Sequence, residues 1–166
     1  YGTDIEVAVE AATLVYGGGF PRNDKSPRHT YHAQRIIYTT TKELEALAEE
    51  VNQGAKIVLC DRGSLDGAVY WPYGEEDFLK TMNTSIKEEY ENYYAVIHMS
   101  PPKEAKYYQN TSVRTETLER ALEVDEAILK LWSGHPRHIV IPESNDYVKK
   151  ALIVRKAIRK IINGEI

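Results

Sequence analysis

The sequence predicts an α/β fold built on a parallel β-sheet with helices on both faces. Segments 56–60, 94–99 and 138–141 are short and apolar without polar alternation, which is typical of strands covered on both faces. Helical segments separate them, and this order implies right-handed crossovers within one sheet. A chain of 166 residues suits one hydrophobic core, so residues 1–166 are expected to form a single domain.

The individual elements follow from local patterns along the chain. Residues 6–10 include β-branched residues and are too short for a helix, so they predict a strand that continues into a short helix at 11–16. Ser26 before Pro27 is a helix start, and apolar spacing extends that helix to about residue 52. After the strand at 56–60, the remaining expected elements are helices at 75–82 and 84–92, a strand at 94–99, a helix at 115–132, a strand at 138–141 and a helix at 146–162.

Composition argues against several classes of protein. Lys and Arg total 21 against 25 Asp and Glu, a net charge of −4, so no nucleic-acid partner is expected. No apolar run approaches the roughly 18 residues of a membrane span, so no integral membrane association is expected. The single cysteine, Cys60, cannot form an intramolecular disulfide, and the default location is therefore the cytoplasm. No protein partner can be named from these observations.

Charged residues follow two of the predicted strands. In open α/β sheets, ligands bind outside the carboxyl ends of the strands, so Glu10, Asp61 and Arg62 are the first candidates for chemistry. Asp61 could bind Mg²⁺ directly or through water, Arg62 could contact a phosphate, and Glu10 could accept a proton from a substrate hydroxyl. The alternatives are structural: Asp61 as a turn or helix-capping residue, and Glu10 as a solvated strand end.

Four motifs in order along the chain resemble the kinase-like P-loop NTPases related to the AAA domain of nicotinamide riboside kinase. They are Glu10-Ala-Ala-Thr13, Cys60-Asp-Arg-Gly63 with Leu65-Asp-Gly67, Val113-Arg-Thr-Glu116 and Trp132-Ser-Gly-His-Pro-Arg137. The resemblance implies a three-layer P-loop NTPase-like sheet and a domain that binds ATP or GTP with Mg²⁺. It also implies that Asp61 and Arg62 serve the metal ion and the phosphates, and that Glu10 is the substrate-side carboxylate.

The same resemblance implies roles for further residues. Arg114 and Arg120 fall where such kinases carry a lid over the phosphates, although a solvated helix explains them as well. His135 and Arg137 precede the last strand, in the loop that touches the nucleotide base in related folds, and turn chemistry is the alternative there. The expected nucleotide- or phosphate-binding residues are thus Arg114, Arg120, His135 and Arg137, and the expected substrate-binding residues are Glu10, Arg22 and Asp66.

One departure from the family pattern limits these expectations. The family begins with a strand and a Gly-x-x-x-x-Gly-Lys-Ser/Thr loop that holds the phosphates, and no such motif occurs in the 166 residues. Gly17-Gly-Gly19 is no substitute, because Pro21 follows closely and lacks the amide hydrogen that a phosphate cradle needs. We therefore expect the first strand and the P-loop to lie upstream of Tyr1, in a longer chain.

Three hypotheses for function remain open. The first is an ATP- or GTP-binding kinase that phosphorylates a small, nucleoside-like hydroxyl substrate. The second is a nucleotide-dependent regulatory or binding module without significant catalysis. A third and weaker hypothesis is an α/β interaction protein that binds no nucleotide, in which Asp61 and Glu10 are structural.

Overall fold

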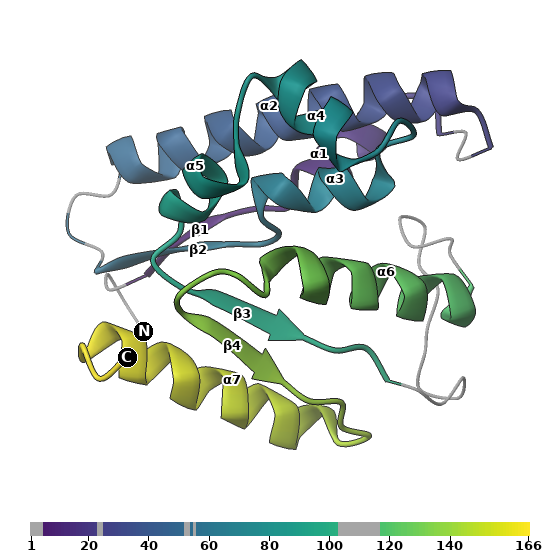
Figure 1. Cartoon of the computed structure of the whole chain (residues 1–166). Helices are drawn as coiled ribbons and strands as arrows, with labels where there is room; N and C mark the ends of the chain where they lie inside the picture. The colour runs from purple at the N-terminus through teal and green to yellow at the C-terminus, as the bar shows by residue number, and fades with distance from the viewer. Residues whose placement is uncertain (1–4, 23–24, 52–53, 55, 103–116) are drawn as a thin grey trace. The chain divides into compact units, whose positions relative to one another are not determined.

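The structure is a computed structural model that describes residues 5–22, 25–51, 54, 56–102 and 117–166 (Figure 1). Contacts group the chain into two compact units, Tyr1–Glu89 and Tyr90–Ile166. No helix in the described part of the chain is long and apolar enough to cross a bilayer.

The first unit contains a parallel pair of strands, β1 (Ile5–Ala8) and β2 (Ile57–Cys60). Their register pairs Ile5 with Ile57 and Ala8 with Cys60, so both strands end at the same edge. The short helix α1 (Ala11–Gly17) follows β1 directly, and the long helix α2 (Pro27–Val51) contacts α1 and both strands. This is the parallel pairing that the apolar segments predict.

Helix α2 begins at Pro27, as the Ser-Pro dipeptide predicts. The Ser26 hydroxyl accepts a hydrogen bond from the His29 amide at 3.4 Å, and the Ser26 carbonyl accepts one from the Thr30 amide at 3.0 Å. Proline at the first helical position costs no hydrogen bond, because amides in the first turn have no partner within the helix. The start is therefore fixed by both side-chain and backbone chemistry.

Four short helices complete the first unit. They are η2 (Ser64–Asp66), a single 3₁₀ turn, α3 (Gly67–Tyr70), α4 (Glu75–Met82) and α5 (Ile86–Glu91). Their core is aromatic: Phe78 is fully buried, and its ring lies edge-on to the rings of Trp71 and Tyr38, with centroids 5.4 and 5.7 Å away. Such edge-to-face contacts stabilise a core beyond the area they bury.

The second unit is built on β3 (Val96–Met99), which pairs in parallel with β4 (His138–Ile141). Figure 1 shows α6 (Leu118–Trp132) and α7 (Tyr147–Ile162) on opposite sides of this pair. Trp132 is buried at the end of α6, where the Tyr90 ring stacks on it at 5.5 Å. The coverage is only partial, because Met99 and Val140 remain 47% and 46% exposed, so the two fully covered faces that the apolar sequence predicts are not observed.

The prediction of alternating strands and helices with parallel pairing is confirmed. The strands described form two separate two-stranded ladders, β1–β2 and β3–β4. The three-layer arrangement around one sheet and the single domain over residues 1–166 stay predictions. Helix α6 begins at Leu118, after Thr117 caps it, and the expected start of this helix at residues 115–116 lies outside the described residues.

Candidate functional site

The candidate site lies at the edge where β1 and β2 end. The Asp61 amide donates a hydrogen bond to the Ala8 carbonyl at 2.9 Å, which extends the ladder by one step beyond Cys60. Glu10 follows β1 by two residues and Arg62 follows β2 by two residues, so the shared edge brings their side chains together. The structure thus places Glu10 and Arg62, two of the predicted site residues, next to each other, and their roles stay predictions.

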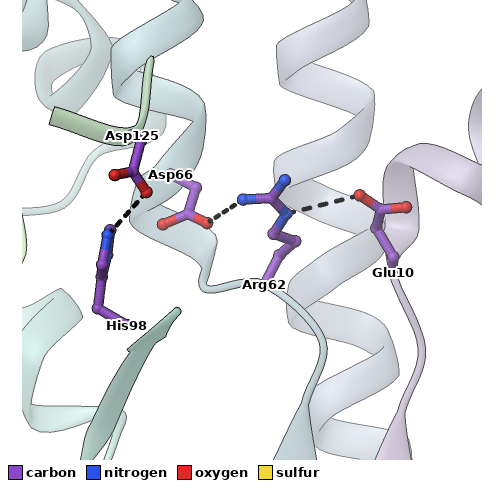
Figure 2. Close-up of polar contacts among 5 residues, drawn as sticks. All are labelled: Glu10, Arg62, Asp66, His98 and Asp125. Carbon is purple, nitrogen blue, oxygen red and sulfur yellow. Dashed lines mark hydrogen bonds and ion pairs between the residues drawn. The ribbon is translucent and has the colours of Figure 1, made fainter. Parts of the chain in front are cut away.

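Arg62 lies between two carboxylates (Figure 2). Its Nε is 3.6 Å from Oε1 of Glu10, and its Nη1 is 3.8 Å from Oδ2 of Asp66. Both distances exceed those of good hydrogen bonds, so the attraction is mainly coulombic. The Arg62 side chain is 46% exposed, whereas Glu10 and Asp66 are 28% and 14% exposed. The guanidinium is therefore held in place while part of it faces solvent.

The backbone aims Arg62 in an unusual way. Its φ is +82°, a left-handed region that a residue with a Cβ adopts only at a cost of roughly 1 to 2 kcal/mol. Gly63 follows, and the chain then tightens into η2, which ends at Asp66. Backbone strain of this kind persists where the surroundings over-determine it, and it gathers at functional sites.

Nearby acids hold the Arg62 charge. Partial burial would by itself lower the pKa of Arg62, but Asp66, Tyr70, Glu10 and Asp61 act in the opposite direction and raise it above its ordinary value. The guanidinium is consequently a fixed positive charge at any pH at which the protein is folded. A fixed cation at a strand edge, with unused N–H donors, suits an anionic group such as a phosphate.

Glu10 is engaged at both carboxylate oxygens. Thr13, one turn into α1, donates its hydroxyl to Oε2 of Glu10, while Oε1 faces Arg62. The Glu10 backbone occupies the N-cap position of α1, yet its side chain does not cap the helix amides. The carboxylate is therefore directed toward the β2 edge.

Asp61 differs from Glu10 because its side chain is exposed and makes no hydrogen bond within the described part of the chain. Mg²⁺ binds through one or two carboxylates, waters and substrate phosphates, so a single exposed carboxylate at this edge fits the ion. No group of three or more His, Cys, Asp or Glu side chains among the described residues could hold a metal ion.

Two other predicted arginines of known position make local contacts. In the first unit, the Arg22 guanidinium lies over the Tyr16 ring, 5.0 Å from its centroid, a cation–π contact. In the second unit, Arg120 pairs with Glu123 one turn along α6, with Nη1 and Oε2 2.9 Å apart. Arg114, which like Arg120 is a predicted phosphate-binding residue, lies outside the described residues.

His135 and Arg137 are tied into the second unit. His135 is buried, its Nε2 lies 2.9 Å from the Tyr93 carbonyl, and its Nδ1 accepts a hydrogen bond from the Arg137 amide at 3.1 Å. These partners define a neutral ring with the proton on Nε2. The Arg137 guanidinium lies 4.1 Å from the centroid of the Tyr94 ring. Their roles in nucleotide binding stay predictions.

The structure also shows a pair that the sequence reasoning did not find. In the second unit, Nε2 of His98 on β3 lies 2.9 Å from Oδ1 of Asp125 on α6 (Figure 2). The His138 ring lies beside His98, and its buried Nε2 lacks a hydrogen-bond partner among the described residues. Burial first, and then the rings of His98 and His135, lower the pKa of His138, which keeps it neutral. Only the tertiary fold joins residues 27 positions apart, so no local signal could have found this pair.

Comparison with known proteins identifies the family. A family model described as an AAA domain matches residues 3–150, which is most of the chain. Searches of curated proteins and of solved structures give no match. The matched region contains both strand pairs and the edge that carries Glu10 and Arg62. The chain therefore belongs to the AAA-domain family, and it is a nucleotide-binding domain of the P-loop NTPase type.

Proposed function

We propose that this domain belongs to a kinase that transfers a phosphate from ATP or GTP to a small, nucleoside-like hydroxyl substrate. The family supports nucleotide binding. The class of acceptor is proposed from the sequence motifs alone, which resemble kinase-like P-loop NTPases. The observation that carries the proposal is the pairing of Arg62 with Glu10 and Asp66 just beyond the ends of β1 and β2. Asp61 precedes Arg62 in the chain. Phosphoryl transfer needs charge neutralisation and positioning more than covalent chemistry, and this arrangement offers both.

Arg62 is proposed to bind phosphate. Its ion pairs with Glu10 and Asp66, at 3.6 and 3.8 Å, are weak enough for a doubly charged phosphate group to displace a carboxylate partner. Guanidinium has five N–H donors, so the arginine can bind a phosphate and keep one carboxylate contact. The flanking acids thus hold the side chain before the ligand arrives, which reduces the entropy lost on binding.

Glu10 is proposed to hold the acceptor hydroxyl. One of its oxygens is fixed by Thr13 and the other faces Arg62, so the carboxylate is already oriented when a substrate enters. A carboxylate in that place can accept a hydrogen bond from the hydroxyl and take its proton as the new P–O bond forms, while the bond from the γ-phosphorus to the bridging oxygen breaks and ADP or GDP leaves. Asp66 and Arg22 are the other substrate-side residues of the proposal.

Asp61 is proposed to hold Mg²⁺ through its exposed carboxylate, directly or through water. When bound, the ion neutralises charge on the phosphates and on the transition state. Arg114, Arg120, His135 and Arg137 are proposed as nucleotide-binding residues on the sequence resemblance alone. Arg120 and Arg137 would each have to leave a present contact, with Glu123 and Tyr94 respectively.

The test is Mg²⁺-dependent phosphate transfer from ATP and from GTP to a panel of nucleosides, measured on the full-length gene product. Arg62→Ala should lower kcat/KM by about 10²- to 10³-fold, the usual loss when one charge-stabilising group is removed. Arg28→Ala is the matched control, because Arg28 is an exposed arginine in the first turn of α2, and it should change kcat/KM by less than about twofold. Equal losses for the two variants would refute the assignment of Arg62.

The second candidate is a nucleotide-binding regulatory module without significant catalysis. The engagement of both Glu10 oxygens favours it, because a carboxylate already bonded to Thr13 and paired with Arg62 is less available as a base. The same experiment separates the candidates. Tight binding of Mg-ATP or Mg-GTP with no transfer to any nucleoside would favour the regulatory module. If neither binding nor transfer is observed, both candidate functions are refuted.

A further inference from the structure

A buried carboxylate lies beside the turn that carries the candidate site. The side chain of Glu89, on α5, is only 1% exposed, and three hydroxyl groups donate hydrogen bonds to it. Tyr38 on α2 and Thr84 before α5 donate to Oε1, at 2.7 and 2.8 Å, and Ser64 donates to Oε2. A buried charge is tolerated only when it is bonded in this way, so the cluster is a built feature of the unit.

The donors keep Glu89 ionised. Burial alone would raise the pKa of Glu89, but the hydrogen bonds from Ser64, Tyr38 and Thr84 outweigh it and leave the pKa below its usual value. A carboxylate held in its charged form accepts hydrogen bonds about twice as strong as those between neutral groups. Glu89 is therefore a rigid acceptor at neutral pH.

Ser64 connects this acceptor to the candidate site. It is buried, it opens η2, and it lies two residues after Arg62 and two residues before Asp66. The Asp66 amide donates a hydrogen bond to the Gly63 carbonyl at 3.1 Å, which closes the turn. Leu65, between them, is fully buried. Fixing Ser64 thus fixes both ends of the Arg62–Asp66 ion pair.

We propose that Glu89 is a positioning residue that acts through Ser64 to hold the turn presenting Arg62 and Asp66. The identity of the ligand rests on the proposed function, whereas the positioning of the turn rests on geometry alone. The chain offers a matched comparison, because Ser64 and Tyr38 each donate one hydroxyl to the same carboxylate. Only Ser64 belongs to the turn.

The experiment compares Ser64→Ala with Tyr38→Phe in the full-length gene product. Tyr38→Phe keeps the ring that packs on Phe78, and each variant removes a single hydroxyl donor. Hydrogen exchange followed by mass spectrometry is measured on peptides that cover 61–67 and, for reference, α4. Ser64→Ala should speed exchange in 61–67 by about tenfold relative to α4, because the turn then opens without its anchor. Tyr38→Phe should leave this ratio unchanged.

A merely structural role for Glu89 gives a different result. In that case both variants would speed exchange in the same segments to the same extent, because both weaken the same cluster, and this outcome overturns the proposal. Glu89→Gln, provided that it folds, should reproduce the local effect of Ser64→Ala. The Ser64/Tyr38 comparison decides the question without it.

A titration with Mg-ATP connects the turn to ligand binding. Ser64→Ala should weaken the affinity by about tenfold and Tyr38→Phe by less than about twofold, with both variants fully folded. Unchanged affinity in Ser64→Ala would show that the ligand does not depend on the turn, and would overturn the link between Glu89 and ligand binding. If the unmodified protein binds no Mg-ATP, the proposed function fails, while the exchange ratio still decides whether Glu89 positions the turn.

Discussion

Gly67 offers the sharpest test of the packing around the site. It is the first residue of α3, directly after Asp66, and its φ of −58° is one that alanine adopts freely. A Cβ added there would lie 3.1 Å from Oε1 of Gln34 and 3.2 Å from Cε2 of Phe78. Phe78 is fully buried between other rings, so it has no space into which to retreat. Gly67→Ala should therefore overpack the core.

The expected magnitude is a difference between two effects. Replacing glycine by alanine at a compatible φ reduces the entropy of the unfolded chain and stabilises by about 0.4 to 1 kcal/mol. Forcing an extra carbon into a filled core costs about 1 to 3 kcal/mol. Because both atoms near the added Cβ are closer than ordinary van der Waals contact, the second effect should win. The free energy of unfolding of Gly67→Ala should fall by about 1 to 2 kcal/mol.

Urea unfolding of Gly67→Ala and of Gly17→Ala measures this difference. Gly17 ends α1, and a Cβ added there meets nothing within 4 Å, so the same substitution should be neutral or stabilising by a few tenths of a kcal/mol. If Gly67→Ala proves as stable as Gly17→Ala, then Phe78 and Gln34 can move aside. The account of a rigid aromatic core behind the turn would then be wrong.

Three more outcomes are expected. Thr117→Ala removes the oxygen that accepts a hydrogen bond from the Arg120 amide, so it should lower the free energy of unfolding by about 1 kcal/mol in urea, and Thr117→Ser should not. Burial first, and then Glu45, raise the pKa of the Cys60 thiol to about 12, so iodoacetamide at pH 8 should react on the order of 10³-fold more slowly than with a free cysteine; a comparable rate would contradict this. The pKa of Glu89 is lower in the folded than in the unfolded state, so its contribution is present above about pH 4.3 and is lost on acidification below it. Between about pH 3 and pH 6, the free energy of unfolding in urea should therefore change less with pH in Glu89→Gln than in the unmodified protein. Curves that run parallel within the error of the extrapolation would contradict this.

Elements with a long pattern or a clear stop could be predicted from the sequence. Helix α2 has a start signal and seven turns of apolar spacing, and β4 is an isolated apolar run, so both are found close to where the patterns place them. The turn η2 and the helix α3 were not predicted. They have three and four residues, which is too short to show the helical periodicity of apolar residues. Burial of Leu65 and Ala68 stabilises them instead.

The candidate site divides in the same way. That Glu10 and Arg62 are neighbours follows from parallel strands ending at one edge, which is a property of the fold class. The buried acceptor does not follow from any local pattern. Glu88 and Glu89 are adjacent glutamates in the same short helix, yet Glu88 is exposed and Glu89 is buried beneath three hydroxyls. Only the positions of Tyr38 and Ser64 in space distinguish the two.

The strand-end residues and the buried contacts beneath them have different physical requirements. This difference explains why the sequence reveals only the strand-end residues. In the proposed function, Arg62 has to be partly exposed and loosely paired, as it is, so that a phosphate can displace a present partner. Its left-handed backbone costs roughly 1 to 2 kcal/mol, whereas each ion pair near solvent contributes at most about 1 kcal/mol and often less. The buried hydrogen bond between Ser64 and Glu89 and the burial of Leu65 stabilise the same turn and help to offset this cost. The residues proposed to face a ligand follow directly after predicted strands, so the sequence reveals them. The residues that stabilise the geometry of the turn lie at positions that no local sequence pattern marks.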